Sequence, residues 1–342
     1  MPVLGLAAFF AYILIFNVSL QEVAARAGQI DLQLYVAAAA TVVLDTFFFC
    51  LAWHSLLRFL SVKLSMLKEF AFVWVGIFVD TLIPAESVAG EISRVYLVNR
   101  EQDGTAGRAT ASVVAQRLIG MGINLGTLLV GALLLLLESQ LQGTIAILMG
   151  FLMGVTFLFL ALLIIMCRRE SLTLGLVNAI IGFAERVSRG RWKLLRFRDD
   201  ALKATRAFHG AMAEYAKAPK AILLASFFSA VSWILALFTL NLTFMAIGRP
   251  ISWSSVLVIS AIFVAVKSIP IGVPFEVGLP EITLTTLFFL FGVPLEIGAT
   301  ATILLRLLTL WLRFFIGFAA QQWVGLRSFT VGGKPPAATA EK

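Results

Sequence analysis

Carboxylates and arginines that interrupt apolar segments are the residues of this sequence whose types and spacing could do chemistry. One stretch reads "IPAESVAGEISR" (83–94) and a distant one reads "PIGVPFEVGLPE" (270–281). Both contain a proline, a glutamate two places later and a second glutamate seven places after the proline. These residues are Pro84, Glu86 and Glu91 in the first stretch, and Pro274, Glu276 and Glu281 in the second.

Each stretch is followed by an arginine at nearly the same distance. Arg117 follows Glu91 by 26 positions, and Arg306 follows Glu281 by 25. The planar guanidinium group presents a fork of donors that matches the geometry of both carboxylate and phosphate groups. We expect each arginine to pair with its glutamate and to exchange it for a polar headgroup. A permanent structural ion pair is the alternative.

Charged side chains inside apolar segments need partners or water. A charge at the centre of a bilayer costs about 2.5–3.5 kcal/mol on insertion scales. The ten charged residues in such segments are Asp45, Asp80, Glu86, Glu91, Arg117, Lys267, Glu276, Glu281, Arg306 and Arg313. Lys267 and Asp80 precede the two stretches and are expected to approach each other. The predicted substrate or translocation residues are Asp80, Glu86, Glu91, Arg94, Arg117, Lys267, Glu276, Glu281 and Arg306.

The composition places these residues in a polytopic, all-α membrane protein. Mean hydropathy is +0.96 and 13% of residues are charged, against about 25% in soluble domains. Six apolar segments are long enough to span a bilayer, near 3–20, 34–57, 110–137, 143–166, 221–247 and 296–325.

Two further apolar segments, 70–98 and 253–292, are interrupted in the middle. The predicted breakers are Pro84, Gly90, Pro270, Gly272, Pro274, Gly278 and Pro280. The arms of the first, of about fifteen and nine residues, would cover roughly 22 and 14 Å of an about 30 Å hydrocarbon core. We therefore predict two re-entrant helical hairpins.

If neither hairpin crosses the membrane, Lys and Arg are distributed unevenly between the loops on its two sides. Segments 58–68, 94–108, 168–220 and 327–342 then share one side, and the opposite loops hold only Arg26 and Arg249. This bias predicts cytoplasmic termini in the cell membrane. The hairpins then open to opposite sides, so units 34–137 and 221–325 form an inverted repeat.

One transmembrane domain is expected over 1–330, followed by a disordered tail at 331–342. The basic, amphipathic segment 168–220 is expected to lie on an anionic leaflet rather than on nucleic acid. The chain has 26 glycines, which favour close helix packing, either within one chain or across a homodimer.

The motifs resemble those of the transmembrane region of lysylphosphatidylglycerol synthases and the related stand-alone UPF0104-type proteins. Gly90, Glu91 and Arg94 match a G-E-x-x-R signature, and Arg117 matches a downstream arginine. A second, looser signature is matched by Gly272, Gly278 and Glu281, with Arg306 beyond it. The resemblance covers nearly the whole chain. Asp80 stands where the family often has Asn, and Glu276 where small residues are common.

The resemblance implies movement of lipids with charged or glycosylated headgroups between leaflets. The synthases carry a soluble aminoacyl-transfer domain after the membrane part, and these 342 residues hold none, so lipid synthesis is not expected. The sequence shows no catalytic constellation, metal cluster or cofactor motif. Membrane lipids, anionic or glycosylated, are the expected substrates. A secondary transporter of a small polar or ionic solute, using the embedded glutamates, is the alternative, and an enzyme is a weaker one.

Overall fold

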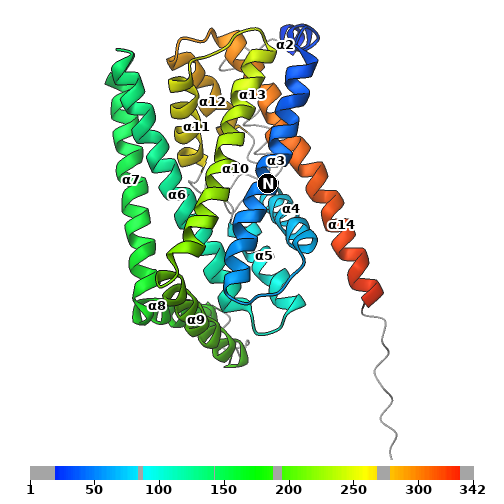
Figure 1. The fold of residues 1–342 in the computed structure, drawn as a ribbon, viewed down its shortest axis with the longest axis vertical. Helices are drawn as coiled ribbons and strands as arrows, with labels where there is room; N and C mark the ends of the chain where they lie inside the picture. Colours follow the sequence, from blue (N-terminus) through cyan, green and yellow to red (C-terminus); the bar gives the residue numbers. More distant parts are fainter. Residues whose placement is uncertain (1–19, 84–87, 142, 188–194, 268–277, 332–342) are drawn as a thin grey trace, which may run out of the picture.

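The computed structural model describes residues 20–83, 88–141, 143–187, 195–267 and 278–331. Every regular element in these ranges is a helix (Figure 1). Several predictions lie outside the described residues: the span at 3–20, the tail from 332 onward, and residues Pro84, Glu86, Pro270, Gly272, Pro274 and Glu276.

Five helices in the described part are long and apolar enough to cross a membrane. They are α3 (Leu32–Phe59), α6 (Ala106–Leu137), α7 (Gly143–Arg168), α10 (Pro219–Ala246), and a continuous helix at Leu295–Gly325. The last is built from α13 (Leu295–Arg306), a π-helical segment η2 (Leu307–Leu312) and the beginning of α14 (Arg313–Val331). They match five of the six predicted spans.

The outer surface of the bundle is apolar, as lipid contact requires. On α7, Ile147 is 76% exposed and Leu158 is 69% exposed. Exposing so much apolar surface to water is unfavourable, whereas contact between the same surface and lipid hydrocarbon is not. The chain is therefore a multi-pass membrane protein.

The first interrupted segment forms two helices, α4 (Met66–Leu82) and α5 (Val88–Glu101), that pack against each other. Their outer ends are joined by Lys68 Nζ and Glu101 Oε2 at 2.5 Å. Near the break, a Cβ atom on Gly90 would overlap the Gly76 carbonyl and the Asp80 carboxylate. The two helices thus run antiparallel, and their closest approach needs a glycine.

Two details of the first hairpin were wrong in the sequence analysis. Gly90 is not a helix breaker: it lies inside α5, where it serves the close approach to α4. α5 has 14 residues, of which eleven follow Gly90 rather than about nine, because the helix continues to Glu101.

The second interrupted segment also forms two helices, α11 (Trp253–Lys267) and α12 (Leu279–Leu290). Gly278 precedes α12 with φ of +102°, a conformation that favours glycine. Pro280 occupies the first turn, where its missing N–H costs nothing. Both predicted breakers therefore lie at the beginning of the returning helix.

The two helix pairs have their outer ends at opposite ends of the bundle (Figure 1). α6 begins beside the end of α3, just before α4, where Arg108 Nη1 donates to the Leu60 carbonyl at 3.4 Å. It ends beside the beginning of α11, where Ser254 Oγ donates to Glu138 Oε2 at 2.6 Å. The short helix α2 (Leu20–Ala27) lies at the α11 end, where Arg26 pairs with Glu296 at 3.2 Å.

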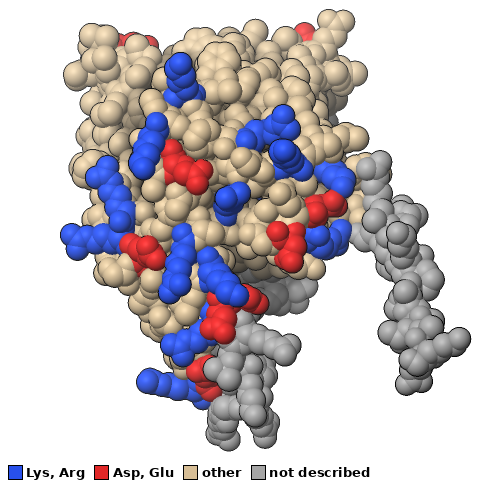
Figure 2. Space-filling view, turned by 60° about the horizontal axis from the view of Figure 1, so that its bottom comes forward, with Lys and Arg blue, Asp and Glu red and all other residues tan. Residues whose placement is uncertain are grey.

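Two helices, α8 (Glu170–Val187) and α9 (Leu195–Ala216), cover the opposite end, near the outer end of α4. Tyr215 on α9 donates to the Leu56 carbonyl at 2.9 Å, which fixes α9 against the end of α3. Figure 2 shows this end of the molecule, where Lys and Arg outnumber Asp and Glu. These helices form the segment that was predicted to be basic and amphipathic.

Buried apolar side chains form one core around each helix pair. Trp53 and Phe72 belong to the core around α4 and α5. Phe244 and Phe288 belong to the core around α11 and α12, with ring centroids 4.7 Å apart. The space between the two cores is where the polar residues of the bundle interior gather.

Candidate functional site

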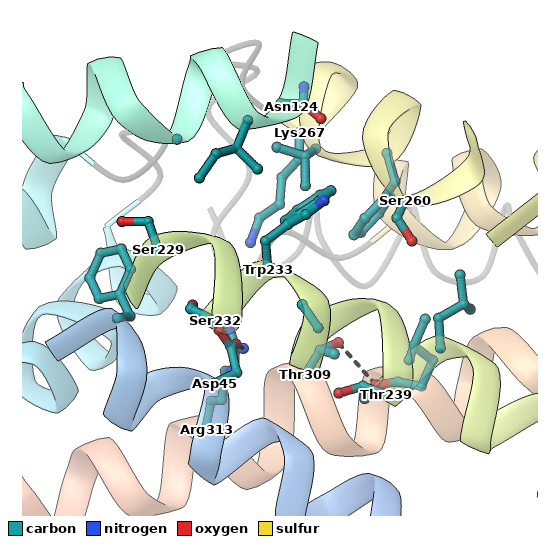
Figure 3. A pocket seen from close by; sticks show the side chains of 18 of the residues that line it. Asp45, Asn124, Ser229, Ser232, Trp233, Thr239, Ser260, Lys267, Thr309 and Arg313 are labelled. Carbon is teal, nitrogen blue, oxygen red and sulfur yellow. Dashed lines mark hydrogen bonds and ion pairs between the residues drawn. The ribbon is translucent and has the colours of Figure 1, made fainter. Parts of the chain in front are cut away.

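A cavity of about 380 Å³ lies inside the helix bundle (Figure 3). Asp45 on α3, Asn124 on α6 and Trp233 on α10 line it, each near the middle of a long apolar helix. Among the residues that the structure describes, the other polar or charged ones that line it are Gln116, Ser229, Ser232, Thr239, Ser260, Lys267, Arg306, Thr309 and Arg313. A cavity at mid-helix depth with polar and charged side chains in its largely apolar wall gives embedded charges a setting other than hydrocarbon.

The glutamate of the second hairpin is paired as the sequence predicts. Arg306 Nε donates to Glu281 Oε1 at 2.6 Å, and the side chains are 7% and 5% exposed. Glu281 Oε2 also accepts from the Gly278 N–H at 2.6 Å and so caps α12. Arg306 lines the cavity, so this ion pair connects the hairpin to it.

The glutamate of the first hairpin is paired in the same way but lies in a more open place. Arg117 Nε lies 3.1 Å from Glu91 Oε1, with side chains 30% and 21% exposed. Neither residue lines the cavity, although the neighbouring Gln116 does.

Asp80 and Arg94 hold the first hairpin together. Asp80 Oδ1 accepts from the Gly90 N–H at 2.6 Å, which ties α4 to the first turn of α5. Arg94 is buried, donates to Gln116 Oε1 at 3.3 Å, and places its guanidinium 5.0 Å from the Trp53 ring centroid. These contacts position α5, and neither residue lines the cavity.

Lys267, the last residue of α11, extends into the cavity toward Trp233 (Figure 3). The predicted approach of Lys267 to Asp80 across the two hairpins stays a prediction.

A third ion pair was not assigned from the sequence. Arg313 Nη2 lies 2.5 Å from Asp45 Oδ2, and Ser232 Oγ donates to Asp45 Oδ1. All three residues line the cavity. In the sequence, only the presence of these two charges in apolar segments pointed to the pair. Asp45 and Arg313 lie outside the two glutamate-bearing stretches and are 268 positions apart.

The π-helical segment lies between the two cavity arginines. Thr309, inside η2, also lines the cavity, with Arg306 before and Arg313 after the segment. Single π-helical turns occur frequently at functional sites because they re-aim side chains on an otherwise regular helix. Here one helix thus directs two guanidinium groups to one cavity.

The apolar helices and the polar interior together define a multi-pass membrane protein with an internal site. Residues 3–317 match the sequence model of the lysylphosphatidylglycerol synthase TM region. The chain belongs to this family.

Two relatives support the same assignment. A UPF0104 membrane protein of Pyrococcus horikoshii is 20% identical over 294 residues, which cover 84% of this chain and 86% of the relative. A UPF0104 membrane protein of Methanothermobacter thermautotrophicus is 26% identical over 330 residues, 94% of both chains.

Proposed function

We propose that this protein moves the polar headgroup of a membrane lipid between leaflets, with the acyl chains left in the bilayer. The observation that carries the proposal is the cavity between two buried cores, reached by the Arg306–Glu281 and Arg313–Asp45 ion pairs. Such a cavity offers a headgroup polar contacts at a depth where hydrocarbon offers none.

The two helix pairs act in this proposal as re-entrant hairpins of an inverted repeat, with units at 34–137 and 221–325. Their outer ends lie at opposite ends of the bundle (Figure 1). Glu91 is the fourth residue of α5 and Glu281 the third residue of α12, and each pairs with an arginine of the following span. Equivalent pairs in opposite orientation suit a site that faces either side in turn.

Exchange of partners is the proposed chemical event. A headgroup phosphate replaces the glutamate on Arg117 at one face and on Arg306 at the other. Removing one partner of a buried ion pair costs about 3–5 kcal/mol when nothing replaces it. A phosphate that takes the place of the carboxylate offsets that cost, because guanidinium binds both bidentately.

The proposed setting is the cell membrane, with both termini in the cytoplasm and with anionic or glycosylated lipids as substrates. The basic end formed by α8 and α9 (Figure 2) supports this orientation, since Lys and Arg concentrate on the cytoplasmic side. Nucleic acid has no part in the proposal, because the basic residues lie beside membrane spans.

Reconstitution in liposomes tests the proposal. Fluorescent lipids of several headgroup classes, including a polyprenyl-phosphate glycolipid, are placed in the inner leaflet, and their appearance outside is followed by chemical quenching. We expect faster transfer of at least one class than in protein-free liposomes. Arg306→Ala and Arg117→Ala should abolish it, whereas the exposed control Arg198→Gln should not.

Absence of transfer for every lipid, together with uptake of a small soluble ion or solute, would replace the lipid translocase with a solute transporter. Transfer that survives both arginine variants would remove the exchange mechanism.

A further inference from the structure

The Gln116 side chain joins three helices at the wall of the cavity. It belongs to α6, is buried, and lines the cavity. Its Oε1 accepts a hydrogen bond from Arg94 Nη1 of α5 at 3.3 Å, and its Nε2 donates to the Phe49 carbonyl of α3 at 2.8 Å. A reversed amide would place its NH2 group against the guanidinium and its oxygen against a carbonyl, so the two partners fix one orientation. Gln116 therefore links α5, one arm of the first hairpin, to α3 and α6.

Arg94 reaches Gln116 from a confined position. Its guanidinium lies 5.3 Å from the Phe49 ring centroid and 5.0 Å from the Trp53 ring centroid, where an aromatic face attracts a cation. A Cβ atom on Gly76 would lie 3.1 Å from Arg94 Cγ, so α4 also packs closely on this side chain. Phe49 itself lines the cavity. A displacement of Arg94 must therefore displace Phe49 and Gln116, both cavity residues, or break its contacts with them.

The Glu91–Arg117 ion pair joins the same two helices a second time. Arg94 follows Glu91 by three positions, which places the two side chains on neighbouring turns of one face of α5. Gln116 and Arg117 are consecutive and so point roughly 100° apart around α6. Gln116 is 5% exposed, whereas the Arg117 side chain is 30% exposed. The contact between α5 and α6 thus has an accessible ion pair and a buried hydrogen bond.

These two links differ in how readily they can open. Another anion can reach Arg117 and take the place of Glu91, as the proposed function requires. The Arg94–Gln116 bond is buried, and breaking it leaves a charged donor without this acceptor, which is unfavourable. The buried link therefore persists while the accessible one exchanges.

We infer that Gln116 is a positioning residue that transmits the place of the first hairpin to the wall of the cavity. The inference rests on the proposed function only for the event that moves α5, the exchange of Glu91 on Arg117. When that ion pair opens, α5 is still held to α6 through Arg94 and Gln116. Movement of α5 then draws Gln116 and Phe49 with it and widens the cavity.

A cysteine elsewhere in the cavity wall reports this coupling without requiring transport. Ser260 on α11 lines the cavity (Figure 3), and Ser260→Cys is placed in the full-length chain with Cys50 and Cys167 replaced by Ala. The rate of its modification by methyl methanethiosulfonate is measured on purified protein in detergent. Glu91→Gln opens the accessible ion pair and should raise this rate about fivefold or more, as expected for two coupled sites.

The same comparison is then made with Gln116 altered. In the Gln116→Met background, where both hydrogen bonds are lost, Glu91→Gln should change the rate by less than about twofold, as expected for independent sites. Gln116→Glu keeps an acceptor for Arg94 and should retain the increase, a rescue that packing alone does not predict. Each ratio is taken within one background, so any direct effect of the substitution on the cavity cancels.

Ser112→Ala is the control for lost stability. Ser112 Oγ is buried and accepts from Trp53 Nε1 at 2.9 Å, so its removal should lower the Tm. It spares both hydrogen bonds of Gln116, and the increase caused by Glu91→Gln should persist. If Gln116→Met fails to fold, Arg94→Lys breaks the link from the other side, because Lys lacks the planar fork of donors. It should likewise abolish the increase.

An increase of the same size in the Gln116→Met background would overturn the positioning role and leave Gln116 a packing residue. No increase with Gln116 in place, or no modification in any variant, would overturn it as well, because α5 would then not move the wall. Coupling in detergent without lipid transfer in liposomes would remove the proposed function and leave the link between α5 and the cavity. Lipid transfer without this coupling would remove the link alone.

Discussion

Arg306 and Glu281 lie 2.6 Å apart with almost no exposed surface, whereas their counterparts Arg117 and Glu91 lie 3.1 Å apart and are about a quarter exposed. The two pairs occupy equivalent places in the two halves of the chain. One ion pair is therefore buried and the other is more accessible. The proposed alternation needs such an asymmetry, with the two pairs exchanging environments.

The asymmetry predicts unequal costs of neutralising the two glutamates. Glu281→Gln leaves Arg306 buried beside a neutral amide and should destabilise the protein by about 3–5 kcal/mol. Glu91→Gln, at a pair whose side chains are 21% and 30% exposed, should cost about 1 kcal/mol or less. Thermal unfolding of both variants in the same detergent measures the difference. Equal losses of Tm would mean that the two pairs share one environment in solution.

A second prediction concerns the close approach of α4 and α5. Gly90→Ala would push a methyl group into the Gly76 carbonyl and the Asp80 carboxylate, and we expect a loss of about 1–3 kcal/mol. Gly126→Ala is the matched control, because a Cβ atom there meets nothing within 4 Å. The control should be neutral or stabilising by up to about 1 kcal/mol, through helix propensity. Thermal unfolding that ranks the two variants the other way would show that the hairpin is not packed through Gly90.

Much of this arrangement was predictable from the sequence because its signals are local. Apolar length predicts the spans, and the spacing of Glu91 to Arg117 and of Glu281 to Arg306 predicts both pairs. The role of Gly90 was not predictable in the same way. A glycine near a proline is equally compatible with a break in a helix and with close contact between two helices. Only the packing of the folded chain distinguishes the two.

The lining of the cavity depends on contacts that no local pattern encodes. Asp45 and Arg313 form their ion pair across 268 positions of sequence. In the sequence, each is a single charge in an apolar segment with no nearby partner to indicate the pairing.

A third prediction concerns how deeply α8 enters the membrane. Leu172, Leu176, Ile180 and Phe183 are exposed and recur at helical spacing along it, as expected of a helix lying in the interface. A spin label at Ile180→Cys, in a chain whose Cys50 and Cys167 are replaced by Ala, should be reached by oxygen in liposomes. A label at the exposed Lys203→Cys of α9 should be reached instead by a water-soluble nickel complex. The reverse pattern, or the same pattern at both sites, would place α8 away from lipid.

The last prediction tests whether the helix pairs return to the side from which they enter. Leu64 and Asp103 flank the α4–α5 pair, and Ile251 and Gly292 flank the α11–α12 pair. If neither pair crosses, cysteines at 64 and 103 both face the cytoplasm and those at 251 and 292 both face outward. A membrane-impermeant maleimide should then label 251 and 292 in intact cells, and 64 and 103 only after permeabilisation. Labelling of all four in permeabilised cells is the control for accessibility. A pair whose two flanks label from different sides would be a full crossing, and the opposed hairpins on which alternating access depends would be lost.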